Sequence, residues 1–140
     1  MDSIQAALIG QSISSIVTNG DDYLALHTTG GVYHLQLDGD CCSRSYLTHI
    51  RGVTTFLDKG VITEVLDASL GEGKGGDCIS QHALILRCSG GDSYAGAPTL
   101  IILWENESNG YYDGSIGLCE APNLPMTSLQ DITKNWEKEK

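Results

Sequence analysis

The segment DYLALHTTGGVYHLQLDGD, residues 22–40, limits the possible folds more than any other part of the chain. Apolar and polar residues alternate on both sides of Gly30–Gly31, and successive side chains of a strand point to opposite faces. A two-residue loop at Gly30–Gly31 predicts a β-hairpin whose apolar face consists of the pairs Leu24–Leu37, Leu26–Leu35 and Thr28–Tyr33. We therefore expect an antiparallel sheet with one face toward a core.

Further strands are expected along most of the remaining chain. Their ranges are 12–18, 61–67, 82–88, 99–105 and 110–120, and an Asn19–Gly20 turn follows the first of them. The run from Leu100 to Trp104 is apolar without a break. Such a run is typical of a central strand that is covered on both faces.

Three short helices are expected around the sheet. The first spans residues 4–9 and is followed by Gly10, which stops it. The second spans the segment CCSRSYLTHIRG, residues 41–52. The third spans residues 127–140, with Leu129, Ile132 and Trp136 along one face. The predicted fold class is α+β, mostly an antiparallel β-sheet with a short N-terminal helix, a short helix after the first hairpin and a C-terminal helix. We expect a single domain, 1–140, with a β-rich core at 1–121 and the helix within 122–140.

Charge and cysteine content narrow the classes of function. Eighteen acidic and eight basic side chains give a net charge of −10, whereas nucleic-acid and anionic-membrane binding require a basic surface. No signal peptide or membrane-spanning run is evident, and the five cysteines cannot all pair within one chain. These features predict a protein of a reducing cytoplasm that binds neither nucleic acid nor membranes.

The glycine-rich segment GEGKGG, residues 71–76, matches the spacing of a dinucleotide-binding loop. That motif must lead from a strand into a helix, which receives the pyrophosphate at its N-terminus. Here the next apolar segment has the pattern of a strand. The segment is therefore interpreted as a connection between strands, and the alternative is a loop that closes over an anionic ligand with Lys74 as its charge.

Metal binding and catalysis find little support in the sequence. Cys41 and Cys42 are adjacent, which disfavours chelation of one tetrahedral ion. His27 and His34 are cross-strand neighbours in the expected hairpin, so one zinc ion could bridge them, but no third ligand is apparent. No motif of a hydrolase or deaminase is present, and Cys41 is a candidate nucleophile only if its pKa is lowered. We predict no catalytic residue, no metal site and no cofactor.

The segment GDCCSRSY, residues 39–46, has the composition of a binding site for an anion. Ser43, Arg44, Ser45 and Tyr46 stand where the chain is expected to enter a helix, whose N–H groups favour anions. Arg44 can hold a phosphate or carboxylate with two parallel hydrogen bonds. Arg87 interrupts an apolar strand, and it either contacts the same ligand or forms a salt bridge to Glu64 or Glu105.

Late in the chain, the segment NGYYDG places two aromatic rings on a turn. Tyr111 or Tyr112 can stack on a planar ligand, while Asn109 and Asp113 can bind sugar hydroxyls or base edges. The alternative is that both tyrosines are half-buried residues of a sheet.

The strings GDCCSRSY and ESNGYYDG together resemble those of an uncharacterised family of small proteins encoded by bacteriophages. The similarity covers most of the chain, from residue 24 to the NGYYDG turn, and it does not extend past Glu120. Phage proteins of this size often counter host defence, either by sequestering nucleotide signals or by occluding a defence protein. The resemblance therefore implies an anti-defence role in the host cytoplasm.

Two functions follow as hypotheses. In the first, the protein sequesters a small nucleotide-derived immune signal without cleaving it, and it assembles as a homodimer or larger homo-oligomer. The arginines would bind phosphate, a tyrosine would stack on the base, and the remaining candidates, Ser43, Ser45, Asn109 and Asp113, would bind the sugar. In the second, an acidic surface blocks a host defence protein. The first hypothesis requires the segments around Ser43 and Tyr111 to line one cavity.

Overall fold

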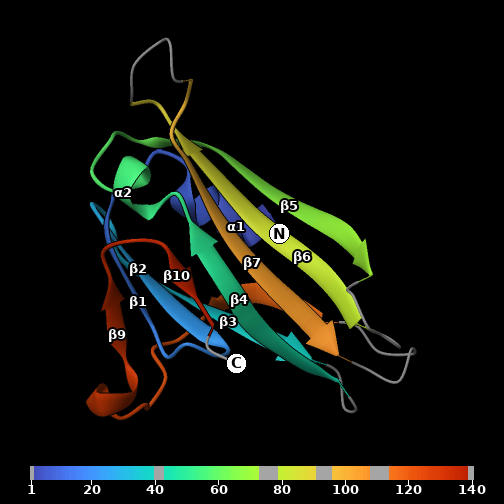
Figure 1. Ribbon diagram of the computed structural model, residues 1–140. Helices are drawn as coiled ribbons and strands as arrows, with labels where there is room; N and C mark the ends of the chain where they lie inside the picture. The colour runs from blue at the N-terminus through green and yellow to red at the C-terminus, as the bar shows by residue number, and fades with distance from the viewer. Residues whose placement is uncertain (1, 40–42, 73–78, 91–95, 108–113, 139–140) are drawn as a thin grey trace.

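The computed structural model describes residues 2–39, 43–72, 79–90, 96–107 and 114–138, which form a sandwich of two antiparallel sheets (Figure 1). Sheet 1 has the strand order β8-β3-β2-β1-β9 and sheet 2 has the order β10-β4-β7-β6-β5. The strands of sheet 1 are β1 (Ile13–Thr18), β2 (Tyr23–Thr28), β3 (Gly31–Gly39), β8 (Gly114–Cys119) and β9 (Gln130–Ile132). Those of sheet 2 are β4 (Arg44–Arg51), β5 (Ile62–Glu72), β6 (Ile79–Cys88), β7 (Thr99–Glu107) and β10 (Trp136–Glu137).

The core lies between the two sheets, because each sheet buries one of its faces. Sheet 1 contributes Leu24, Leu26 and Leu35, and sheet 2 contributes Leu84, Leu86, Ile102 and Trp104, all at most 2% exposed. Removal of this apolar surface from water is the main driving force for the sandwich. The mostly antiparallel character that the sequence predicts is confirmed.

The predicted hairpin is present, but its register is wrong by two residues. Leu24 lies opposite Leu35 and Leu26 opposite Tyr33, whereas Thr28 lies opposite Gly31. The loop is Thr29–Gly30, because the Thr28 hydroxyl accepts from Gly30 N–H at 3.1 Å and donates to the Gly31 carbonyl at 2.8 Å. A slip of two residues keeps every side chain on its face, so the apolar face is as predicted although its pairs are not.

The same slip separates the two histidines that could have shared a zinc ion. His27 lies opposite Val32, and His34 lies opposite Ala25. Nδ1 of His34 is 2.6 Å from the Tyr23 hydroxyl instead. Among the described residues, no group of three or more His, Cys, Asp or Glu is placed to hold a metal ion.

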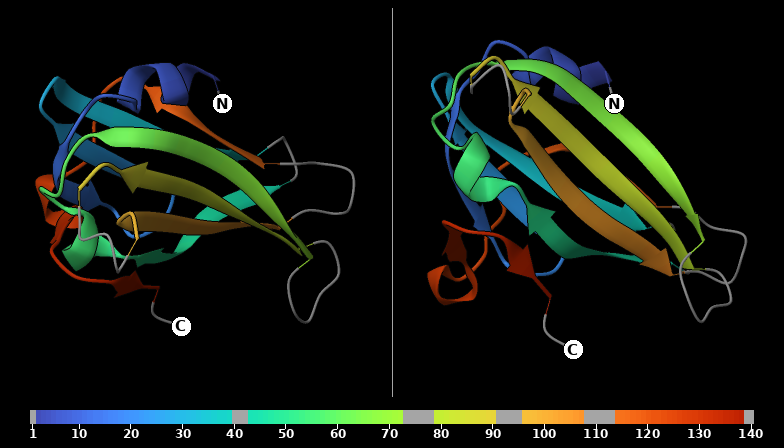
Figure 2. Two further views of the ribbon diagram at one scale, coloured as in Figure 1. Left: turned by 90° about the horizontal axis from the view of Figure 1, so that it is seen from above. Right: turned by 45° about the horizontal axis from the view of Figure 1, so that its top comes forward.

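The N-terminal helix, α1 (Asp2–Leu8), is confirmed, and it closes one side of the sandwich. Ile4 and Leu8 are fully buried, and the helix lies beside β5 and β8, the edge strands of the two sheets (Figure 2). The Gln5 amide donates to the Val65 carbonyl at 2.9 Å, which covers part of the free edge of β5. None of the described helices is long and apolar enough to cross a membrane.

The helix expected over residues 41–52 is wrong, since residues 44–51 form β4. Leu47 and Ile50 both face the core although they are three positions apart. A β-bulge between Leu47 and His49 adds one residue to the strand, so the apolar residues acquire a spacing that suits a helix. The short helix α2 (Val53–Phe56) begins only after Gly52, whose positive φ of 82° ends the strand.

The C-terminal helix is also wrong. Residues 122–138 contain only a 3-10 turn, η1 (Met126–Ser128), followed by β9 and β10. Ile132 lies opposite Ile16 and is buried, and Trp136 lies opposite Ile50. The Asn135 side chain accepts from the N–H groups of Gly52 and Val53 at 2.8 and 3.2 Å. These contacts override the local preference for a helix, and the tail joins one edge of each sheet.

The central position of β7 in sheet 2 is confirmed, but β7 is not covered on both faces. Leu100, Ile102 and Trp104 are buried between the sheets, whereas Ile101 and Leu103 on the outer face are only half-buried. The apolar run that predicted two covered faces therefore leaves an apolar surface on the outside of sheet 2.

Candidate functional site

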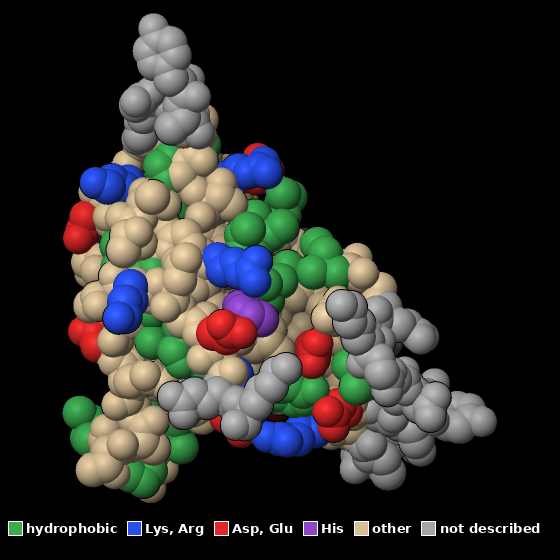
Figure 3. All heavy atoms as spheres, viewed as in Figure 1, with side chains coloured by type: hydrophobic (Ala, Val, Ile, Leu, Met, Phe, Trp, Pro, Cys, Tyr) green, Lys and Arg blue, Asp and Glu red, His purple; other side chains and the backbone are tan. Residues whose placement is uncertain are grey.

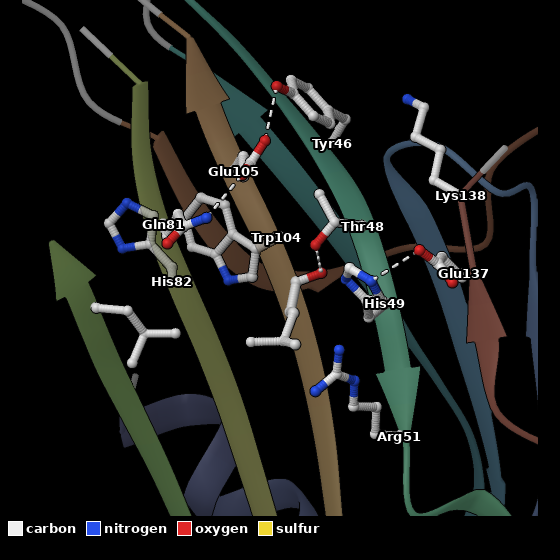
Figure 4. Close-up of a pocket in the computed structure, with 12 residues that line it drawn as sticks. Tyr46, Thr48, His49, Arg51, Gln81, His82, Trp104, Glu105, Glu137 and Lys138 are labelled. Atoms are coloured by element: carbon white, nitrogen blue, oxygen red, sulfur yellow. Dashed lines mark hydrogen bonds and ion pairs between the residues drawn. The ribbon is translucent and has the colours of Figure 1, made fainter. Parts of the chain in front are cut away.

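A groove on the outer face of sheet 2 is the candidate functional site. It has a volume of about 600 Å³ and is lined by residues of β4, β5, β6, β7 and β10. In Figure 3 hydrophobic and charged side chains adjoin on this face. Paired residues of neighbouring strands share a face, so the pairs Tyr46–Glu105 and His49–Leu103 both lie on the outer face. Figure 4 shows the Tyr46, His49 and Glu105 side chains along the groove.

One end of the groove is built around the Tyr46 phenol. Its oxygen lies 3.0 Å from Glu105 Oε1 and 2.8 Å from Glu107 Oε1. The Gln81 amide donates to the other oxygen of Glu105 at 3.0 Å. Burial raises the pKa of Tyr46, and the hydrogen bonds to Glu107 and Glu105 raise that pKa further. The phenol therefore stays protonated and holds two carboxylates at this end.

The Tyr46 ring is also in contact with two cations. Nζ of Lys138 lies 4.6 Å from the ring centroid, and the Arg44 guanidinium carbon lies 5.2 Å from it. Both cations pair with Asp21, at 3.1 Å for Arg44 and 3.6 Å for Lys138. The ring, the cations and Asp21 thus connect β4 to the turn before β2 and to the C-terminal tail.

Replacing Tyr46 by phenylalanine is expected to flatten the pH dependence of stability above pH 10. An unfolded tyrosine ionises near its model value of 10.0, while the folded phenol keeps its proton to a higher pH. The folded state then binds more protons, so the free energy of unfolding falls as pH rises, by up to about 1.4 kcal/mol per pH unit. Urea unfolding of both proteins at pH 7 and at alkaline pH measures the difference. If the free energy of unfolding fell by the same amount between the two pH values in both proteins, this role of Tyr46 would be contradicted.

Arg51 supplies a cation at the other end of the groove. It follows His49 on the outer face of β4 and lies opposite Ile101. Its guanidinium group points into the groove (Figure 4). Within the described part of the chain no carboxylate forms an ion pair with Arg51. The neighbouring His49 has its Nε2 3.3 Å from Glu137 Oε1.

The floor between the two ends is apolar. Leu103 lies between the Arg51 and Glu105 positions on β7, and Leu70 of β5, 53% exposed, lines the side. Trp104 is buried and stacks on His82 with ring centroids 4.2 Å apart, which fixes β6 against β7. The groove thus presents acceptors at one end, an apolar floor, and at the other end a cation that pairs with no carboxylate among the described residues.

The structure separates the site residues that the sequence predicts between residues 43 and 46. Tyr46 lines the groove, and Arg44 reaches its ring but is paired with Asp21. Ser45 points inward, where its hydroxyl donates to the Asp38 carbonyl and accepts from Asn106, so it is not available to a ligand in the groove. Ser43 lies just before β4. These residues enter a strand, so the helix N-terminus expected here does not exist.

Arg87 forms the salt bridge to Glu64 that the sequence left as one alternative, at 3.1 Å. It lies opposite Thr99, whereas Tyr46 lies opposite Glu105. Six residues of β7 separate these two rows, or about 20 Å along the strand. Arg87 and Tyr46 therefore cannot hold the same small group.

Four predicted site residues, Asn109, Tyr111, Tyr112 and Asp113, lie outside the described residues, as do Cys41, Cys42 and Lys74. The described residues on either side of 108–113 lie near the start of β4. Glu107 is opposite Arg44, and Gly114 is opposite Gly39 and packs against the Ser45 side chain. The common cavity for the two segments stays a prediction.

Sequence reasoning missed the residues that give the groove its character. These are His49, Arg51, Gln81, Leu103 and Glu105. Arg51 is one of only three arginines in an acidic chain, and this scarcity is a signal that the sequence offers. The sequence pattern places Arg51 at the end of a helix instead, because the bulge between Leu47 and His49 interrupts the alternation of the strand.

The fold and the groove define this chain as a two-sheet β-sandwich with an open, ligand-sized site. No protein-family model matches the chain, and no curated protein or solved structure matches it significantly. A function is therefore inferred from the chemistry of the groove.

Proposed function

We propose that the protein is a binding protein that holds a small nucleotide-like ligand in the groove without cleaving it. The observation that carries this proposal is Arg51, a cation with no ion-pair partner in the described part of the chain, placed at the end of an apolar floor. A volume of about 600 Å³ lies within the usual range for small-molecule sites.

The groove offers a different contact to each part of such a ligand. The Arg51 guanidinium can bind a phosphate or carboxylate with two parallel hydrogen bonds. The Leu103 side chain supports a planar ring, and the Glu105 oxygens can accept further hydrogen bonds from amino or hydroxyl groups. Four residues of β7 separate the Arg51 and Glu105 rows, or about 13 Å, so the ligand must be elongated.

Sequestration fits these residues better than catalysis does. The Glu105 carboxylate already accepts hydrogen bonds from Tyr46 and Gln81, so it is held as a fixed acceptor. A sequestering protein needs slow release of its ligand and no chemical step. The net charge of −10 repels anions at long range, and that repulsion is screened beyond about 8 Å at physiological salt. Together with the resemblance to phage proteins, this supports capture of a nucleotide-derived immune signal.

The proposal is tested by capture and release. The purified full chain is incubated with a panel of linear and cyclic nucleotides, washed and denatured, and the released molecules are identified by mass spectrometry. Recovery of an intact nucleotide supports sequestration. Recovery of a cleaved product indicates an enzyme. If no nucleotide is retained and a host protein is captured from a cell extract instead, the alternative of a blocking protein replaces the proposal.

A further inference from the structure

The outer face of sheet 2 carries an apolar surface that extends beyond the groove. Two rows of cross-strand neighbours form it, and we call these six residues the apolar stripe: Leu66, Ile85 and Ile101 in one row, and Ala68, Ala83 and Leu103 in the other. Leu66 is 39% exposed although it is a large apolar side chain, Ala83 is buried, and the other four residues are half-buried. Figure 1 shows no described helix in front of this face.

The sequences of β6 and β7 are unusual for an open face. An antiparallel sheet with one wet face alternates apolar and polar residues, whereas continuous apolar runs are typical of strands covered on both sides. Exposed apolar patches with a polar rim mark sites of association. Here Arg87 and Glu64 border one end of the stripe, and Gln81 and Glu105 border the other.

We propose that the apolar stripe is the interface of a homodimer in which two copies pack sheet 2 against sheet 2. The charges of the face favour a second copy. Arg51 and Arg87 outnumber Glu64 at one end, whereas three carboxylates outnumber two cations at the other end, Glu105, Glu107 and Asp21 against Arg44 and Lys138. A two-fold axis across the strands turns one copy end for end, and it sets the positive end of each copy over the negative end of its partner.

The size of the face is sufficient for a stable dimer. Nine residues of β7 extend for about 30 Å, and five strands span roughly 20 Å. This flat area is on the order of 600 Å², and the relief of the side chains increases it toward the ~800 Å² per partner of a standard interface. The stripe adjoins the groove at Leu103, so the partner copy would close the open side of the groove.

Dimerisation is tested on the full chain, without ligand, by analytical ultracentrifugation over a concentration series. We expect a dimer for the unmodified protein and at least a 100-fold rise in the dimer dissociation constant for Leu66→Glu. The matched control is Val32→Glu, because Val32 is 43% exposed but lies on the outer face of sheet 1. Urea unfolding of both variants verifies that each is folded.

A monomeric unmodified protein at about 100 µM would overturn the homodimer. If the two substitutions raised the dimer dissociation constant equally, or if neither raised it, the interface would lie away from the apolar stripe. Either result would also overturn the proposal. Because no ligand enters this experiment, its failure leaves the capture test unaffected. A monomer that still retains a nucleotide would refute the dimer and preserve the proposed function.

Discussion

Replacing Arg51 by glutamate is expected to weaken the capture of an anionic nucleotide by about 100-fold, which corresponds to about 2.8 kcal/mol. The substitution removes a guanidinium that has no ion-pair partner in the described part of the chain and puts a like charge beside the ligand's anionic group. Arg51 is exposed, so the fold should tolerate the change. Isothermal titration with a nucleotide recovered in the capture experiment measures the loss.

The chain contains a matched control for this experiment. Arg87→Glu makes the same charge change on the outer face of the same sheet, but Arg87 is paired with Glu64 in another row. Its effect on affinity should be within about threefold, from long-range charge alone. Arg51→Lys keeps the charge and loses the paired hydrogen bonds, so an intermediate affinity is expected. Equal losses for Arg51→Glu and Arg87→Glu would show that net charge and not the groove determines binding.

Replacing Trp104 by alanine is expected to lower the free energy of unfolding by about 3–5 kcal/mol. Its indole is 2% exposed, belongs to the core and stacks on His82 of the neighbouring strand. Truncation leaves a large cavity in the middle of sheet 2 next to the floor of the groove. Urea unfolding followed by circular dichroism measures the loss.

Trp136→Ala provides the comparison, because the chain has two tryptophans. Trp136 is half-buried on the two-residue strand β10, so its truncation should cost less than about 2 kcal/mol. If Trp136→Ala proved the more damaging of the two, the core would not be centred where the structure places it.

The sequence predicts β1, β2 and β3 of sheet 1 more precisely than their pairing, and it misses β9. The alternation of apolar and polar residues is enough to predict that Leu24, Leu26 and Leu35 face inward. A register shift of two residues leaves each of these side chains on the same face. The register depends on which residues turn the chain. The turn lies at Thr29–Gly30 because the Thr28 hydroxyl forms hydrogen bonds with Gly30 and Gly31. The hydrophobic pattern of the sequence contains no information about these bonds.

Both wrong helices have one cause. Leu47 and Ile50 have a helical spacing because a bulge inserts one residue into β4. Leu129, Ile132 and Trp136 also have a helical spacing, but they belong to a tail that pairs with both sheets. Local spacing cannot distinguish a short helix from a bulged or interrupted strand. Only partners distant in the sequence decide the outcome, as Ile16 does for Ile132.

The candidate site could be predicted only in part. Tyr46, which the sequence predicts as a site residue, lines the groove. Arg51, Leu103 and Glu105 lie on two strands, and their convergence follows from the pairing of β4 with β7. Arg87 and Ser45 were plausible by composition, but pairing directs one to Glu64 and the other to the interior.

A crystal structure of the protein with its captured nucleotide tests the central claim most directly. We predict that the anionic group lies within hydrogen-bond distance of the Arg51 guanidinium, that the planar ring lies over Leu103, and that the far end of the ligand is hydrogen-bonded to Glu105. A ligand bound on sheet 1, or in the groove with its anionic group away from Arg51, would contradict it.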